Sequence, residues 1–115
     1  TFCKPCVEEI PHFMYLADKY RKDSLRLLLV SLDMPDMYPK KLKAFIRKNK
    51  YHYPVVWLDE SNADYFLPKI DDSWSGSIPA TLIVHTRSGY REFLESSLTK
   101  AELEKEIQEA LRSSR

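Results

Sequence analysis

Apolar residues follow two different spacings along this chain, which predicts a protein of mixed helices and strands. Residues 5–20 place Val7, Ile10 and Met14 at helical intervals, so this stretch is predicted to be a helix. Residues 25–32 form a nearly unbroken apolar run. Such a run is typical of a strand buried on both faces of a parallel sheet.

The middle of the chain repeats this alternation. A second helix is predicted from Pro39, because a residue that precedes proline is disfavoured in helical conformation. Residues 55–58 are predicted to form a short buried strand. Residues 59–77 are polar and include Pro68 and Gly76, so they are predicted to form a long loop, a feature that usually has a functional role.

The last third of the chain predicts a hairpin followed by a helix. Residues 80–85 and 90–94 are the expected strands, and residues 86–89 supply the turn. Thr99 and Glu102 have the spacing of a capping box at the start of the last helix. The order is helix, strand, helix, strand, hairpin, helix, which indicates an α/β fold.

Composition narrows the class of protein. The chain has 115 residues and is predicted to be one domain, residues 1–115. Its net charge of +1 argues against a nucleic-acid partner that is held by charge. No stretch of the sequence has the length and apolarity of a transmembrane helix.

The chain has 2 cysteines, Cys3 and Cys6, in a Cys-x-x-Cys pair where the first helix is expected to begin. Residues three apart share one side of a helix, so the thiols are close enough to form a disulfide. Cys3 is the candidate nucleophile, because unpaired backbone N–H groups at a helix start stabilise a thiolate. Lys4 is expected to lower the pKa of that thiol, and Pro5 suits the first turn.

Two other interpretations of the cysteine pair are less favoured. Half of a zinc site would need further ligands, and only His12 lies nearby. A purely structural disulfide across so short a loop would constrain the unfolded chain very little.

Three other residues have open roles from the sequence alone. Glu9 shares a helix face with Cys6 and is either the acceptor of its proton or a solvated carboxylate. Trp74 is either a wall of a binding site or packing beneath the long loop. Pro79 stands at the start of a strand, and base rates favour a trans bond before it.

Three segments together resemble the TlpA/ResA-like thiol–disulfide oxidoreductases, which have the thioredoxin fold. Residues 3–11, CKPCVEEIP, resemble the C-x-P-C-x-x-E-x-P segment of that family. Residues 76–81, GSIPAT, resemble its cis-proline loop. Residues 82–84 with the RSG turn at 87–89 resemble its final hairpin.

The resemblance implies a thioredoxin-like three-layer α/β/α sandwich with a mixed sheet and a protein disulfide oxidoreductase activity. It implies that Cys3 attacks, that Cys6 resolves, and that Glu9 is a buried acid. The Ile78–Pro79 bond would be cis, and the backbone of Ile78 would pair with a substrate segment. The residues expected at the substrate are Phe2, Lys4, Pro5, Trp74, Ile78 and Pro79.

The same resemblance implies partners and a location. The only redox group would be the Cys3–Cys6 disulfide, with no metal and no organic cofactor. Protein thiols or disulfides and an upstream electron donor would be the partners. The protein would act as an extracytoplasmic reductant, in the periplasm or anchored to a membrane. The alternative function is a thioredoxin-fold binding module with an inert disulfide.

The chain departs from the family in two places. Phe2 stands where the family commonly has tryptophan before the first cysteine. The central strand of the family precedes the cysteine motif, so the 115 residues are expected to be N-terminally incomplete. The strands at residues 25–32 and 80–85 are then expected to flank an empty position in the sheet.

Overall fold

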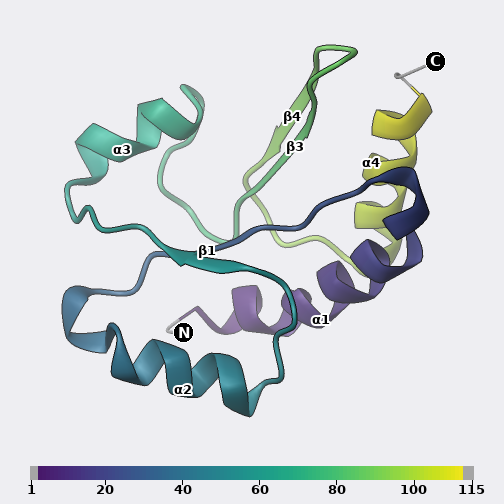
Figure 1. Ribbon diagram of the computed structural model, residues 1–115. Helices are drawn as coiled ribbons and strands as arrows, with labels where there is room; N and C mark the ends of the chain where they lie inside the picture. The colour runs from purple at the N-terminus through teal and green to yellow at the C-terminus, as the bar shows by residue number, and fades with distance from the viewer. Residues whose placement is uncertain (1–2, 113–115) are drawn as a thin grey trace.

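The computed structural model describes residues 3–112, which form two small sheets surrounded by helices (Figure 1). The first half contains helix α1, strand β1, helix α2 and strand β2, and short 3-10 turns follow α1 and β1. Their bounds are Lys4–Lys19, Leu29–Ser31, Lys40–Lys48 and Val55–Trp57. The second half contains α3, β3, β4 and α4, at Ala63–Ile70, Thr81–His85, Tyr90–Leu94 and Lys100–Arg112.

The strands pair in two separate ladders. β1 and β2 are parallel, with Val30 opposite Val56. β3 and β4 form the predicted antiparallel hairpin, with Ile83 opposite Glu92. Within residues 3–112, β1 and β3 do not pair with each other, so the mixed sheet is divided into two at the position that was expected to be empty.

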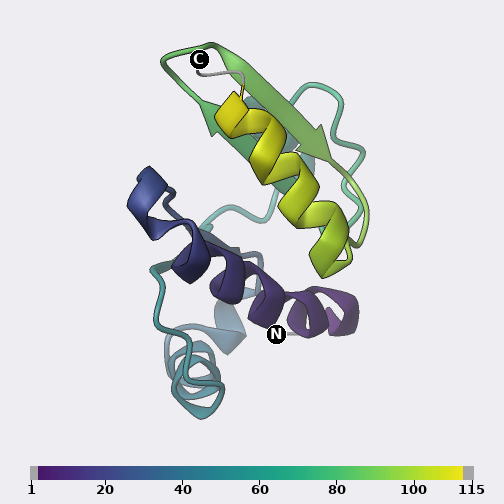
Figure 2. The ribbon, with the colours of Figure 1, turned by 90° about the vertical axis from the view of Figure 1, so that its right-hand side faces the viewer.

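The best-buried part of the molecule lies between α1, α4 and β3, and Figure 2 shows α4 along the hairpin with α1 beneath it. Leu16 of α1 is 0% exposed and meets Leu103 and Ile107 of α4. Ile83 and Leu98 pack against this cluster. The predicted capping box is confirmed, because the Thr99 N–H donates to Glu102 and the Glu102 N–H donates to the Thr99 hydroxyl.

A cleft of about 830 Å³ occupies the expected empty position between the two sheets. Residues of both β1 and β3 line it. Val30 and Val84, which are aliphatic strand residues, are each 50% exposed, and Leu82 is 38% exposed. The edges of β1 and β3 are therefore separated by a partly apolar cleft rather than joined by hydrogen bonds.

Two sequence predictions are wrong in extent. Residues 59–77 do not form one loop, because α3 lies within them and Asn62 caps it by accepting the Asp64 N–H at 3.1 Å. The apolar spacing of Phe66, Leu67 and Ile70 was the missed helical signal. The strand expected over residues 25–32 is confined to β1, because its ladder to β2 begins only at the Leu29 N–H.

Candidate functional site

The two cysteines form a disulfide at the start of α1. Their sulfurs are 2.02 Å apart and their Cα atoms 5.2 Å apart. Cys3 is the N-cap residue with extended backbone angles, and Cys6 lies in the first turn. Both are partly exposed, so the disulfide is accessible from solvent.

The helix start supplies a hydrogen bond to Cys3. The backbone N–H of Cys6 donates to the Cys3 Sγ over 3.3 Å, in the position where a side-chain oxygen usually caps a helix. A hydrogen-bond donor and the positive end of the helix dipole both favour negative charge on sulfur. The start of α1 therefore places a hydrogen-bond donor beside the Cys3 sulfur.

Lys4 lies on the exposed side of the first turn of α1, beside an acidic residue. Its side chain is 88% exposed, and its Nζ lies 3.9 Å from the Glu8 carboxylate one turn along the helix. Solvent and this acidic neighbour both screen its charge. Pro5 is exposed in the first turn, as its missing N–H allows.

Glu9 is buried and is not a solvated carboxylate, because its residue is only 8% exposed. Its Oε2 accepts a hydrogen bond from the backbone N–H of Leu98 over 3.0 Å. Burial raises the pKa of Glu9, and the Leu98 N–H and the charge of His12 oppose that rise. A carboxyl group with a raised pKa is suited to exchange protons nearer neutral pH.

Trp74 is a packing residue that supports the segment before Pro79. It is 9% exposed, and its ring lies between Phe66 and Phe93, at centroid distances of 6.1 and 5.8 Å. Its indole N–H donates to the Ser77 carbonyl over 2.8 Å. The Ile78–Pro79 bond is cis, as the resemblance implied.

The cleft brings most of the predicted site residues together. Its lining includes Cys3, Cys6, Glu9, Trp74, Ile78 and Pro79. Lys4 and Pro5, on the exposed first turn of α1, are not among the residues that line it. Phe2, the remaining predicted residue, lies outside the residues that the structure describes.

Sequence reasoning missed two residues of this site. Leu98 contributes through its backbone N–H, which leaves no signature in side-chain identity. Asp33 is only 3% exposed, lines the cleft, and accepts a 2.7 Å hydrogen bond from the Ser31 hydroxyl. Its position directly after a buried strand was the available signal, because side chains at the carboxyl ends of parallel strands often serve ligands.

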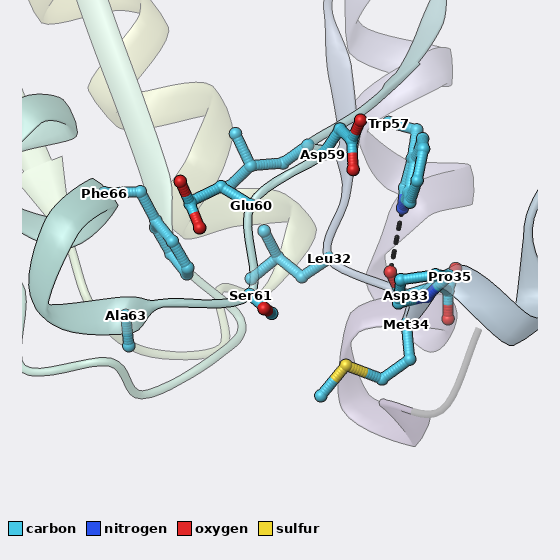
Figure 3. A pocket seen from close by; sticks show the side chains of 11 residues that line it. Leu32, Asp33, Met34, Pro35, Trp57, Asp59, Glu60, Ser61, Ala63 and Phe66 are labelled. Carbon is cyan, nitrogen blue, oxygen red and sulfur yellow. Dashed lines mark hydrogen bonds between the residues drawn. The ribbon is translucent and has the colours of Figure 1, made fainter.

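A second pocket of about 230 Å³ opens at the carboxyl ends of β1 and β2 (Figure 3). Leu32 and Asp33 line both this pocket and the cleft. The Trp57 indole donates to the Asp33 carbonyl over 2.8 Å, and Phe66 of α3 forms part of the opposite wall. The small pocket therefore borders the cleft that holds the disulfide.

Residues 3–112 contain no group of three or more histidine, cysteine, aspartate or glutamate side chains arranged to hold a metal ion. In the same part of the chain, no helix combines the length and apolarity needed to span a membrane.

Comparison with known proteins identifies relatives of the chain. The thiol-disulfide oxidoreductase ResA of Geobacillus kaustophilus (strain HTA426) is 22% identical over 94% of this chain and 57% of its own length. The thioredoxin-like protein YneN of Bacillus subtilis (strain 168) is 27% identical over 93% of this chain and 58% of its own length. The sporulation thiol-disulfide oxidoreductase A of Bacillus subtilis (strain 168) is 32% identical over 49% of this chain and 34% of its own length.

The chain thus spans a little over half the length of the curated relatives that it matches throughout. No solved structure matches it significantly. The profile of the AhpC/TSA family matches residues 1–88, which include the cysteine pair, Glu9 and Pro79. The alternation of helices and strands and these relatives agree with the TlpA/ResA-like resemblance. With its thioredoxin-like α/β fold, the chain belongs to the AhpC/TSA family.

Proposed function

We propose that this chain is a protein thiol–disulfide oxidoreductase whose reactive group is the Cys3–Cys6 pair. One observation carries the proposal: the disulfide caps α1, is partly exposed, and opens into the same cleft as Glu9, Ile78 and Pro79. The partly exposed sulfurs at the start of the helix leave the disulfide open to a partner thiol or disulfide. Three relatives with thiol-disulfide oxidoreductase or thioredoxin-like in their names support it.

The exchange proceeds in two steps. The Cys3 thiolate attacks one sulfur of a substrate disulfide, forms a mixed disulfide, and releases the first substrate thiolate. Cys6 then transfers its proton to the Glu9 carboxylate and attacks the Cys3 sulfur. The Cys3–Cys6 disulfide forms and the second substrate thiolate leaves, so two electrons pass from the enzyme to the substrate.

In this proposal the chain acts as a reductant of extracytoplasmic proteins, in the periplasm or beside a membrane that anchors it. An upstream dithiol donor then reduces Cys3–Cys6 after each turnover, and no metal or organic cofactor takes part. The backbone of Ile78, in the cleft lining, pairs with an extended segment of the substrate, as a strand added to a sheet edge would.

The alternative is a binding module whose disulfide stays closed. The partly exposed aliphatic residues Val30, Leu82 and Val84 beside the cleft favour a binding function. The reduction potential of Cys3–Cys6 separates the two functions. A potential within the range of cellular dithiol donors supports exchange, and a potential far below that range supports the inert module.

Trapping of mixed disulfides tests the roles of the two cysteines. Cys6→Ala leaves Cys3 able to attack but removes the residue that resolves the intermediate, so this variant is expected to accumulate mixed disulfides with partner proteins. Cys3→Ser is expected to accumulate almost none. Non-reducing electrophoresis measures the difference, and equal trapping by both variants would contradict the assignment.

A further inference from the structure

The carboxylate of Glu9 is held from a distant part of the chain. Its hydrogen-bond donor is the backbone N–H of Leu98, which is 89 residues further along the sequence and directly before α4. The Glu9 residue is 8% exposed. A buried carboxylate depends strongly on such a donor, because little water remains to replace it.

Two features keep the Leu98 N–H in place. The Leu98 side chain packs against the core cluster that contains Leu16 and Leu103. The next residue, Thr99, belongs to the capping box, with hydrogen bonds of 2.9 and 3.1 Å to and from Glu102. The donor therefore belongs to the well-packed region between α1 and α4 rather than to a loose loop.

The charged groups near the start of α4 and along α1 belong to the two elements that hold Glu9 and its donor. His12 on α1 favours the charged carboxylate through its own charge. On α4, Glu102 is engaged with Thr99, and the Lys100 Nζ lies 3.6 Å from the centroid of the Tyr15 ring. Burial raises the pKa of Glu9, and the Leu98 N–H is the largest influence that lowers it.

We propose that the backbone N–H of Leu98 positions the Glu9 carboxylate to take the proton of Cys6, so that the start of α4 controls the pH range of the second exchange step. This inference rests on the proposed function. The Cys6 Sγ gives up its proton to a Glu9 oxygen, and the resulting thiolate attacks the Cys3 sulfur as described above. Leu98 does not contact the reacting sulfurs in this scheme and is a positioning residue.

Replacing a single amide with an ester tests the inference directly. Leucic acid at residue 98 keeps the leucine side chain and replaces the N–H with an oxygen, and the matched control is the corresponding ester at Thr99. Both esters remove a donor at the start of α4, but only the first removes the donor to Glu9. The protein is reduced and loaded at Cys3 with thionitrobenzoate, and its release by Cys6 is followed by absorbance across a pH series.

The ester at residue 98 is expected to move the acidic limb of the pH–rate profile to higher pH and to slow release on that limb by about tenfold, since a lost hydrogen bond to a charged group is worth about this much. The ester at Thr99 is expected to move the profile much less, because the Leu98 N–H remains and the second capping bond, from the Glu102 N–H to the Thr99 hydroxyl, is kept. Carbon-13 NMR of labelled Glu9 is expected to show the same displacement of the carboxyl titration, which is a readout independent of activity.

Two further variants keep the inference testable if the ester disturbs the fold. Glu9→Asp retains a carboxylate but shortens its reach to the Leu98 N–H, so the acidic limb is expected to move in the same direction. Leu98→Ala retains the N–H but loses the side-chain packing that helps to keep it in place, so the acidic limb is expected to move in the same direction by less than with the ester at residue 98. If the unaltered chain exchanges thiols but both esters give the same pH–rate profile, the proposed role of Leu98 is wrong. If the unaltered chain does not exchange thiols, the proposed function itself is wrong.

Discussion

The packing between α1 and α4 and the strand faces beside the cleft contain similar aliphatic side chains, but they bury them to different degrees. Leu16 and Leu103 are 0% and 3% exposed. Val30 and Val84 are each 50% exposed. The difference therefore does not come from side-chain hydrophobicity but from whether a partner element lies against the side chain.

Backbone hydrogen bonding explains why the helices bury their aliphatic side chains and the strands beside the cleft do not. A helix satisfies its own N–H and C=O groups and needs only an apolar surface to face. A strand needs a neighbour at its edge as well as cover on its faces. Residues of β1 and β3 both line the cleft, and within residues 3–112 the two strands do not pair with each other.

The largest expected effect concerns residues 1–115 produced by themselves. Unpaired backbone groups along β1 and β3 cost about 1–3 kcal/mol each where they are removed from water, and a domain has only about 5–15 kcal/mol of net stability. We therefore expect no cooperative monomeric melt in a thermal scan followed by circular dichroism. Amide exchange is expected to be slower in α4 than in β1. A cooperative monomeric transition at an ordinary temperature would contradict the comparison between the two regions.

The next effect compares one aliphatic residue from each region. Leu16→Ala is expected to cost about 2–5 kcal/mol, because it opens a cavity where the side chain is fully enclosed. Val84→Ala is expected to cost less than about 0.5 kcal/mol while the cleft is open. Exchange of α4 amides measures both losses without requiring a global melt. Similar costs for the two substitutions would mean that the cleft face is covered.

Glu9 is expected to have a smaller, pH-dependent effect. Because its pKa is raised in the folded state, the folded chain holds the proton more tightly than the unfolded chain. Its cost to stability is therefore absent below the ordinary value of 4.5 and grows as pH rises through the folded pKa. Glu9→Gln is expected to stabilise the fold near neutral pH and to change nothing in acid. Amide exchange at both pH values checks this, and an equal gain at both would indicate a change in packing instead.

The smallest expected effect lies at the exposed first turn of α1. Lys4→Ala removes the 3.9 Å pair with Glu8, in which both side chains are well exposed. Such pairs one helical turn apart contribute about 0.3–0.5 kcal/mol or less. Amide exchange along α1 in Lys4→Ala beside Glu8→Ala measures this contribution. A loss much larger than this would show that the charge of Lys4 acts on Cys3 or on a partner.

Much of the fold was predictable from particular residues. The apolar spacing of residues 5–20 predicted α1, the turn at residues 86–89 predicted the hairpin, and Thr99 with Glu102 predicted the start of α4. Each of these signals is local, because caps, turns and helical faces depend on residues a few positions apart. The helix α3 was missed because Pro68 and polar neighbours hid its apolar spacing.

The side chains of the candidate site were predictable from the sequence. The backbone contacts and the burial of those side chains were not. The cysteine spacing placed Cys3 and Cys6 in one disulfide. Burial of Glu9 was left open, because burial depends on α4 and not on the neighbours of Glu9 in the sequence. Trp74 also had two open roles, and the structure shows that it packs against Phe66 and Phe93 and lines the cleft as well.

The sequence by itself determined the order of helices and strands apart from α3, the pairing of its cysteines and the residues of the reactive motif. Only the tertiary structure decided that Leu98 donates to Glu9, that Trp74 supports the segment before Pro79, and that β1 and β3 stand apart across a cleft. The physical reason is the range of the interactions. Local hydrogen bonds and side-chain periodicity are encoded within one or two turns, whereas burial and strand pairing depend on segments far apart in the chain.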